Sequence, residues 1–233
     1  MKPPPLIVIG RARTPYAQKF GTPRQPGLAP HAEGFLEFFA PYGNPEAFCG
    51  LAGFSHVQVL FWFHKLPPFK GFRARVRPPR LGGNASVGVF ASRSPFRPNP
   101  IGLSTLRLLA IEDHQGEVRL KVAGPDLVDG TPLLDIKPYV PFVDSVPEAT
   151  GGYVDGPPRP CELRVSAPLK AWLLAHLGEE RTRALCESLA QDPRPGYQND
   201  PTREYFLPYA RFDVGFTVHG DTLTVTRLKA LND

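Results

Sequence analysis

Up to about Ala149, the chain holds many short strand-like segments and no helix long enough to cross between parallel strands. Parallel strands need a crossover connection of a dozen or more residues, which is usually a helix. One short helix is expected here, over residues 44–51, with Asn44 as its N-cap and Pro45 at its first position. The region therefore predicts an antiparallel sheet or barrel. Strands are expected at 6–13, 32–39, 55–63, 85–91, 101–111, 117–123 and 133–137.

The rest of the chain has a different pattern. Residues 150–160 are rich in glycine and proline and are the best candidate for a linker. Helical periodicity follows at 167–176 and 179–190, and alternation at 211–219 and 222–228 predicts a hairpin. We therefore expect a mainly β protein, with an antiparallel β-barrel domain over residues 1–150 and a small α+β C-terminal domain over residues 160–233.

Composition and short motifs exclude several classes of protein. The chain has 233 residues, of which 42% are hydrophobic, so it can bury a large core and is not wholly disordered. Its three cysteines are far apart and form no CxxC pair, so neither a disulfide framework nor a zinc site is indicated. The simplest inference is that the protein works in a reducing compartment. The apolar run at 6–9 is too short for a signal peptide or a membrane span, so we expect a soluble, cytoplasmic protein. No GxGxxG motif follows a strand, so a Rossmann cofactor site is not supported.

Positive charge is concentrated in one stretch. Between Ala47 and Ile111 there is no Asp or Glu, whereas nine of the 27 Lys and Arg residues lie there. The net charge of +5 therefore hides a strongly basic region and a remainder of −4. Such a region attracts phosphate groups, although a solvated loop rich in proline and arginine would have the same composition.

Two stretches combine rigid turns with charged side chains. Residues 90–104 (FASRSPFRPNPIGLS) place Arg93 and Arg97 among prolines that fix the backbone. This is either a loop that holds a ligand or a stiff surface connection. Residues 124–139 (GPDLVDGTPLLDIKPY) contain Asp126, Asp129 and Asp135. We interpret these aspartates as turn residues by default, and we predict no metal site because no His or Glu joins them at ligand spacing.

Three shorter segments are also candidates. Residues 22–27 (TPRQPG) form another rigid loop with one guanidinium and one amide. His64 and Lys65 follow the aromatic strand, where a histidine is more often structural than a general base. Residues 192–198 (DPRPGYQ) contain an Arg and a Tyr that could stack on an RNA base, or else form a docking loop between domains.

Together, SRSPFRPNPIGLS (92–104), DLVDGTPLLDIKPY (126–139), SHVQVLFWFHK (55–65) and TPRQPG (22–27) closely resemble the TsaA-like family, also called TrmO. The resemblance covers nearly all of the chain. It implies a β-barrel with a small C-terminal domain and a homodimer. It also implies methyl transfer from S-adenosylmethionine to the N6 atom of N6-threonylcarbamoyladenosine, next to the anticodon of a threonine tRNA.

The resemblance further implies where the ligands bind. The family's S-adenosylmethionine positions fall here on Pro23, Arg24, Gln25, His64, Lys65, Arg93, Leu103, Asp126, Leu127, Val128, Asp129, Gly130 and Thr131. Contacts to the tRNA are expected from Arg97, Lys137, Tyr139, Arg194 and Tyr197. The catalytic base is not identified, and His64 and Tyr139 are only candidates for it.

Two other functions stay open on the residues alone. A non-catalytic, basic β-barrel that binds RNA would have the same acid-free stretch. An enzyme acting on another small nucleotide could use the same pockets.

Overall fold

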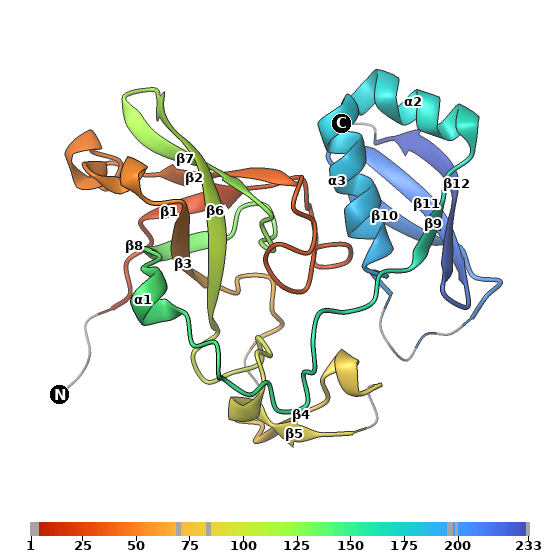
Figure 1. Cartoon of the computed structure of the whole chain (residues 1–233), viewed down its shortest axis with the longest axis horizontal. Helices are drawn as coiled ribbons and strands as arrows, with labels where there is room; N and C mark the ends of the chain where they lie inside the picture. Colours follow the sequence, from red (N-terminus) through yellow and green to blue (C-terminus); the bar gives the residue numbers. More distant parts are fainter. Residues whose placement is uncertain (1–4, 69–70, 83–84, 195–197, 199, 232–233) are drawn as a thin grey trace.

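The computed structural model describes residues 5–68, 71–82, 85–194, 198 and 200–231, and the protein is mainly β (Figure 1). Six strands close a barrel in the order β1-β2-β7-β6-β3-β8, and every neighbouring pair is antiparallel. The shortest pairing, between β1 and β8, closes the barrel. The predicted fold class is therefore confirmed. The strands are β1 Gly10–Arg13, β2 Glu33–Phe38, β3 His56–Trp62, β6 Ile101–His114, β7 Glu117–Ala123 and β8 Pro132–Pro138.

The barrel interior is filled by alternate residues of its strands, as the period of two in a pleated strand requires. Val57, Val59 and Phe61 of β3 point inward and pack against residues of the other strands, including Leu106 and Leu120. Gly102 gives the Phe61 ring its space, because a Cβ at this position would lie 2.2 Å from the ring. The interior is thus a packed core and not a channel.

The connection from β3 to β6 forms an arm that projects below the barrel in Figure 1. We define the arm as residues 71–82 and 85–91, which are the described parts of this segment. It contains the short strands β4 Arg75–Val76 and β5 Val87–Gly88 and the 3-10 turns η3 Pro79–Leu81 and η4 Val89–Ala91. The strand predicted at 85–91 is therefore wrong over most of its length, because the chain turns after Gly88.

Helical structure in the barrel region is limited to short turns. The helix predicted at 44–51 is instead two 3-10 turns, η1 Pro45–Phe48 and η2 Leu51–Gly53. Its predicted cap is confirmed, because the Asn44 side chain accepts a hydrogen bond of 3.0 Å from the Glu46 amide. A four-residue helix, α1 Pro141–Asp144, precedes the predicted linker.

The C-terminal unit, which we define as residues 162–230, is a four-stranded sheet with two helices. The sheet order is β10-β11-β12-β9, and only the β12–β9 pair is parallel. Pro208 lies within β10, where no strand is expected from the sequence, and is tolerated because β10 is an edge strand. The elements are β9 Glu162–Arg164, α2 Ala167–Leu177, α3 Glu179–Ala190, β10 Tyr205–Tyr209, β11 Phe212–His219 and β12 Thr222–Ala230.

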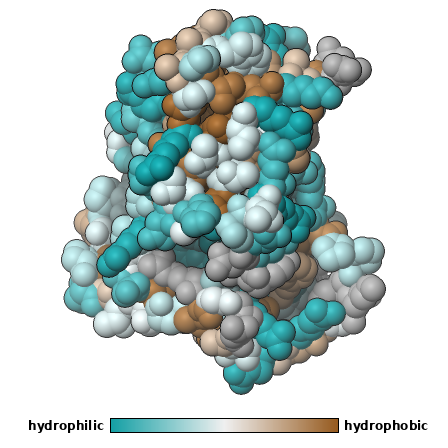
Figure 2. Space-filling model, turned by 90° about the vertical axis from the view of Figure 1, so that its right-hand side faces the viewer, coloured by the Kyte–Doolittle hydropathy of each residue, from teal (hydrophilic) through white to brown (hydrophobic). Residues whose placement is uncertain are grey.

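The core of the C-terminal unit includes residues from the N-terminal part of the chain. Tyr16, Ala29 and Ala32 are buried in it, and Phe20 packs against it. The loop that carries them, residues 14–32, runs between the barrel and the C-terminal unit in Figure 1. Figure 2 shows the molecule from the side of the C-terminal unit, and apolar residues gather in the upper part of this face. The second core thus crosses the boundary that the linker suggests.

Candidate cofactor site

Three connections leave the barrel at the same end. They are the β1–β2 connection (14–32), the β3–β6 connection (63–100) and the β7–β8 connection (124–131). The strand register shows their common end, because Trp62 pairs with Ile101, Glu33 with Ala123 and Arg11 with Pro132. All the expected cofactor residues lie on these connections, apart from one near the start of β6. The antiparallel topology therefore gathers segments that are far apart in the sequence.

Side chains join the first two connections. The Arg93 Nη1 donates to the Gln25 Oε1 at 2.7 Å, and the Gln25 Nε2 donates to the Arg24 carbonyl at 2.6 Å. The Lys65 Nζ donates to the Ala17 carbonyl at 2.6 Å. Three of the expected cofactor residues therefore form one continuous hydrogen-bonded chain.

The third connection adds a carboxylate to this end of the barrel. Ser104 points into the barrel, and its hydroxyl donates to the Asp126 Oδ1 at 2.6 Å. Burial raises the pKa of Asp126 to about 6, while the Ser104 hydrogen bond and the charge of Arg93 act in the opposite direction. Asp126 is thus a partly buried acid close to an arginine.

The other aspartate of this connection shapes its turn. The Asp129 carboxylate accepts from the Thr14 amide at 3.0 Å and from the Arg13 Nη1 at 3.4 Å. Gly130 has a φ of 78°, and the Thr131 hydroxyl donates to the Val128 carbonyl at 2.6 Å. These contacts are those of a tight turn in which an aspartate orders the backbone. Leu127, in the same turn, is buried in the barrel core.

His64 lies at the end of the aromatic strand, as the sequence predicts. Burial lowers its pKa below the usual value, and the positive charge of Lys65 lowers it further. The charge of Asp129 acts in the opposite direction, but it is the smallest of the three effects. The imidazole is therefore neutral at neutral pH and able to accept a proton.

Leu103 and Arg97 complete this group on the β6 side. Leu103 is 56% exposed and points away from the barrel interior, so it offers an apolar surface beside the loops. Arg97 stabilises its own loop, because its Nη1 donates to the Ser92 carbonyl at 2.7 Å and to the Val89 carbonyl at 3.1 Å. Its guanidinium also lies 5.6 Å from the centre of the exposed Phe90 ring.

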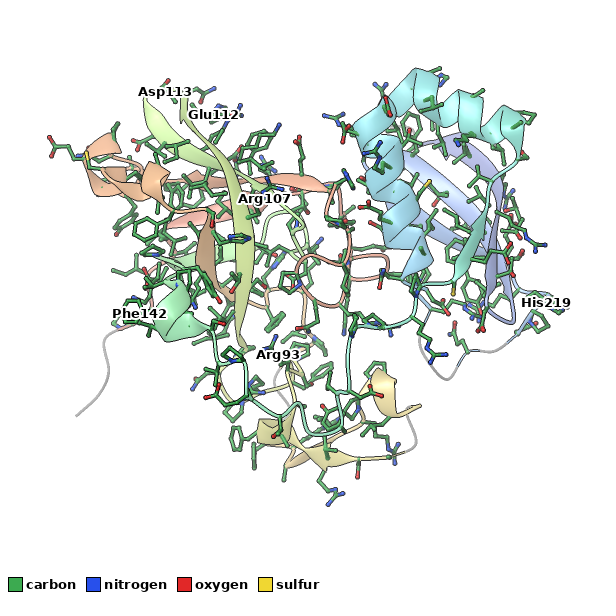
Figure 3. All side chains as sticks on the ribbon, viewed as in Figure 1. Arg93, Arg107, Glu112, Asp113, Phe142 and His219 are labelled. Carbon is green, nitrogen blue, oxygen red and sulfur yellow. The ribbon has the colours of Figure 1, made fainter. Side chains whose placement is uncertain are left out.

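The other expected tRNA contacts lie elsewhere. Lys137 and Tyr139 are at the far end of β8, where the Tyr139 amide donates to the His56 carbonyl at the start of β3. Figure 3 shows Arg93 near the loop end of the barrel, whereas Arg107, which pairs with His56, lies farther along β6. A single chain therefore does not bring Lys137 and Tyr139 to the three connections.

Of the two candidate tRNA contacts in the C-terminal unit, Arg194 is buried. Arg194 is only 8% exposed, and its guanidinium makes two hydrogen bonds to the Asp192 carboxylate, at 2.9 and 2.8 Å. Tyr197 lies outside the described residues.

Sequence reasoning missed three supporting residues, namely Arg13, Thr14 and Ser104. Ser104 lies within the motif that carries the resemblance, and the alternation of β6 would have predicted that it points inward. The contacts of Arg13 and Thr14 to Asp129 join residues more than a hundred positions apart, so no local signal could have found them.

Among the described residues, no group of three or more His, Cys, Asp or Glu side chains is arranged to hold a metal ion. Within the same residues, no helix is long and apolar enough to cross a membrane.

Comparison with known proteins identifies the class to which this barrel and its loop-built site belong. The family model described as the tRNA-methyltransferase O N-terminal domain matches residues 11–145, and the model described as the TrmO C-terminal domain matches residues 158–231. These two models cover most of the chain. The chain therefore belongs to the tRNA-methyltransferase O family.

Individual relatives agree with this assignment. The chain is 50% identical over 196 residues to the tRNA (adenine(37)-N6)-methyltransferase of Escherichia coli, which covers 82% of each chain. It is 46% identical over 210 residues to a Pseudomonas aeruginosa protein named "Putative S-adenosylmethionine-dependent methyltransferase RcsF", which covers 88% of this chain and 89% of the relative. The crystal structure of TrmO from Pseudomonas aeruginosa superposes with a TM-score of 0.80 at 35% identity, covering 98% of this chain and 99% of the other.

Proposed function

We propose that this chain transfers a methyl group from S-adenosylmethionine to the N6 atom of N6-threonylcarbamoyladenosine, next to the anticodon of a threonine tRNA. One observation carries the proposal: three connections meet at one end of the barrel and bring Arg24, Gln25, Arg93 and Asp126 together. The relatives named as tRNA (adenine(37)-N6)-methyltransferases support the reaction and the kind of substrate.

The residues at this end fit the chemical groups of the cofactor. S-adenosylmethionine carries a carboxylate, an ammonium group, ribose hydroxyls and an adenine ring. Arg24 and Arg93 are exposed guanidinium groups suited to a carboxylate, and Asp126 is a carboxylate suited to an ammonium or hydroxyl group. When bound, the cofactor supplies an electrophilic methyl group on a sulfonium centre.

The residues of the chain contribute mainly by placement. Methyl transfer is an in-line displacement, so holding donor and acceptor in line accounts for much of the rate increase. The connections are suited to this because hydrogen bonds tie them to each other and to the barrel. His64 is the better placed of the two candidate bases, since it lies beside Lys65 at the cofactor end, whereas Tyr139 is at the opposite end of β8. We assign His64 the acceptance of the N6 proton.

The arm supplies the surface for the tRNA backbone. Arg73 and Arg77 are exposed on it, within the stretch of sequence that contains no Asp or Glu. Phe72 and Phe90 stack with ring centres 6.2 Å apart and are 57% and 71% exposed. Arginine and exposed aromatic rings are the usual partners of RNA phosphates and unstacked bases.

The protein is a homodimer in this proposal, and it works in the cytoplasm. The positions of Lys137 and Tyr139 fit a dimer, because one chain alone does not bring these residues to the three connections. Light scattering coupled to size-exclusion chromatography checks the dimer, and a mass near 25.7 kDa, which is that of one chain, would contradict it.

The test of the reaction is incubation with labelled S-adenosylmethionine and threonine tRNA that carries the modified adenosine. We expect label in the RNA, and none in the same tRNA lacking the threonylcarbamoyl group. The proposal is wrong if neither tRNA is labelled while an authentic relative labels the first one.

A further inference from the structure

We infer that the turn at residues 192–194 of the C-terminal unit positions the cofactor loop, which we define as residues 22–27, and that it acts through Arg24. The name of this loop rests on the proposed function, but the contacts do not. Arg24 is expected to bind the cofactor, yet one edge of its guanidinium is engaged by the C-terminal unit. The Arg24 Nη2 donates to the Arg194 carbonyl at 2.8 Å and to the Asp192 carbonyl at 3.3 Å.

The two carbonyls are held in place by a charged turn. Asp192 has a φ of 47°, in the left-handed region that Asp and Asn adopt more readily than other residues with a side chain. Its carboxylate accepts from the Arg194 amide at 3.2 Å and from the Arg194 guanidinium at 2.9 and 2.8 Å. Because Arg194 is almost completely buried, this pair fixes the turn before any ligand binds.

The chain on the N-terminal side of the loop is seated on the same unit. The Phe20 ring stacks on Phe216, with ring centres 6.2 Å apart and an angle of 15° between the planes. Gly21 lies against Leu207 so closely that a Cβ would be 1.8 Å from the Leu207 Cδ1. The C-terminal unit therefore holds the entry of the loop through apolar packing and its centre through Arg24.

The contacts continue to the other side of the loop. The Arg24 carbonyl accepts from Gln25, and Gln25 accepts from Arg93 on the connection that follows β3. Among the described residues, the Arg24 guanidinium donates through Nη2. A planar guanidinium that is fixed at one edge presents its other N–H groups in a set direction. The turn at 192–194 thus sets the direction in which Arg24 can meet a ligand.

The test is a double-mutant cycle on cofactor binding. Asp192→Asn keeps a residue that tolerates the left-handed conformation but removes the charge that holds Arg194. Arg24→Met keeps an unbranched apolar stem and removes the guanidinium with its donors. We expect Asp192→Asn to weaken S-adenosylmethionine binding, measured by calorimetry, by about 2- to 10-fold, the effect of one or two hydrogen bonds. In the Arg24→Met background, the same change should have an effect of less than about twofold.

Hydrogen exchange of the free protein gives a readout that needs no cofactor. We expect faster exchange of peptides covering residues 20–27 in both variants. In Arg164→Ala, which removes an exposed ion pair to Glu162 in the same unit, exchange of these peptides should be unchanged. Additive effects in the cycle, or unchanged exchange in both variants, would overturn the inference. If the protein binds the cofactor without methylating tRNA, the proposed function is wrong, but the double-mutant cycle still tests whether the turn positions Arg24. If it does not bind the cofactor, hydrogen exchange alone decides.

Discussion

At the scale of single residues, two pairs of polar side chains lie in apolar surroundings, and the members of each pair are hydrogen-bonded to each other. Ser104 and Asp126 form such a pair at the loop end of the barrel. Tyr16 and Ser188 form another, with 2.9 Å between their hydroxyl oxygens, where the barrel meets the C-terminal unit. A buried polar group is tolerated when it is hydrogen-bonded, so removing one partner tests what the other depends on.

Asp126 should make stability depend on pH. Its folded pKa of about 6 lies above the unfolded value near 3.9, so the unfolded state releases the proton first as pH rises. Below about pH 4 the acid is neutral in both states, and above about pH 6 the folded state carries the full cost of a buried charge. We therefore expect Asp126→Asn to gain stability relative to the wild type between pH 4 and 6, by about 1–3 kcal/mol, and then to level off.

Urea unfolding at several pH values from 4 to 8 measures this difference. Asp113→Asn, at the exposed tip of the β6–β7 hairpin (Figure 3), serves as the matched control. If the difference in unfolding free energy between Asp126→Asn and the wild type is the same at every pH, burial does not raise the pKa of the Asp126 carboxyl.

The hydroxyl pair at the junction predicts two unequal effects. Ser188→Ala leaves the buried Tyr16 hydroxyl without a partner, which should cost about 1–3 kcal/mol of unfolding free energy. Tyr16→Phe leaves Ser188 with its second bond, a donation of 2.8 Å to the Ala184 carbonyl, so it should cost only about 0.5–1.5 kcal/mol. Urea denaturation of both variants decides, and a larger loss for Tyr16→Phe would contradict the account.

At the scale of elements, alternation and turn residues predicted the strands of the barrel but not the order in which they pair. Glu117–Ala123 is a strand at the predicted bounds, and its hairpin turns through Gln115 and Gly116, which both have positive φ. The sequence pattern could not show that β9 pairs with the distant β12, because three residues carry no clear period. Regions with local signals were therefore predictable, whereas elements defined by long-range pairing were not.

The candidate site divides in the same way. The resemblance selected Arg24, Gln25, Arg93 and Asp126, and the fold brings these residues to one end of the barrel. The strand-end placement of His64 was also predictable, because an aromatic, β-branched run precedes it. That Arg24 bonds to the C-terminal unit was not, since this contact joins residues about 170 positions apart.

Two glycines in the first connection allow the cost of backbone strain to be distinguished from the cost of a steric clash. Gly21 and Gly27 have φ values of 89° and 76°, so alanine is strained at both. A Cβ would strike Leu207 at Gly21, but it would meet nothing within 4 Å at Gly27. We expect Gly27→Ala to cost about 1 kcal/mol and Gly21→Ala clearly more, because the clash adds to the strain. Equal midpoints in urea denaturation would show that Leu207 moves aside without cost.

At the scale of the whole molecule, positive charge is distributed unevenly along the chain. The acid-free stretch includes the arm and the loop that follows it, whereas the remainder of the chain is net negative. Positive charge is thus concentrated near the loop end of the barrel, where Arg93 lies (Figure 3). Such a field draws a polyanion toward one side of the protein and makes binding sensitive to salt.

This distribution predicts the salt dependence of tRNA binding. Each phosphate contact that is removed should lower the slope of log K against log salt by about 0.7–0.9. We expect the double variant Arg73→Ala and Arg77→Ala to lower the slope by about 1.4–1.8, measured by fluorescence anisotropy with labelled tRNA. Arg183→Ala, on α3 and paired with Glu179, is the matched control. A slope unchanged from the wild type would remove the arm from the tRNA interface.

The insertion of Tyr16, Phe20, Ala29 and Ala32 into the second core limits how this protein can be taken apart. Cutting the chain at the linker would expose these side chains and leave an apolar, aggregation-prone surface on the isolated barrel. If the C-terminal unit were fused to another barrel, its core would lack these four side chains. The two halves of the polypeptide are therefore not interchangeable modules, and any chimera must carry the segment 14–32 together with the carboxy-terminal part.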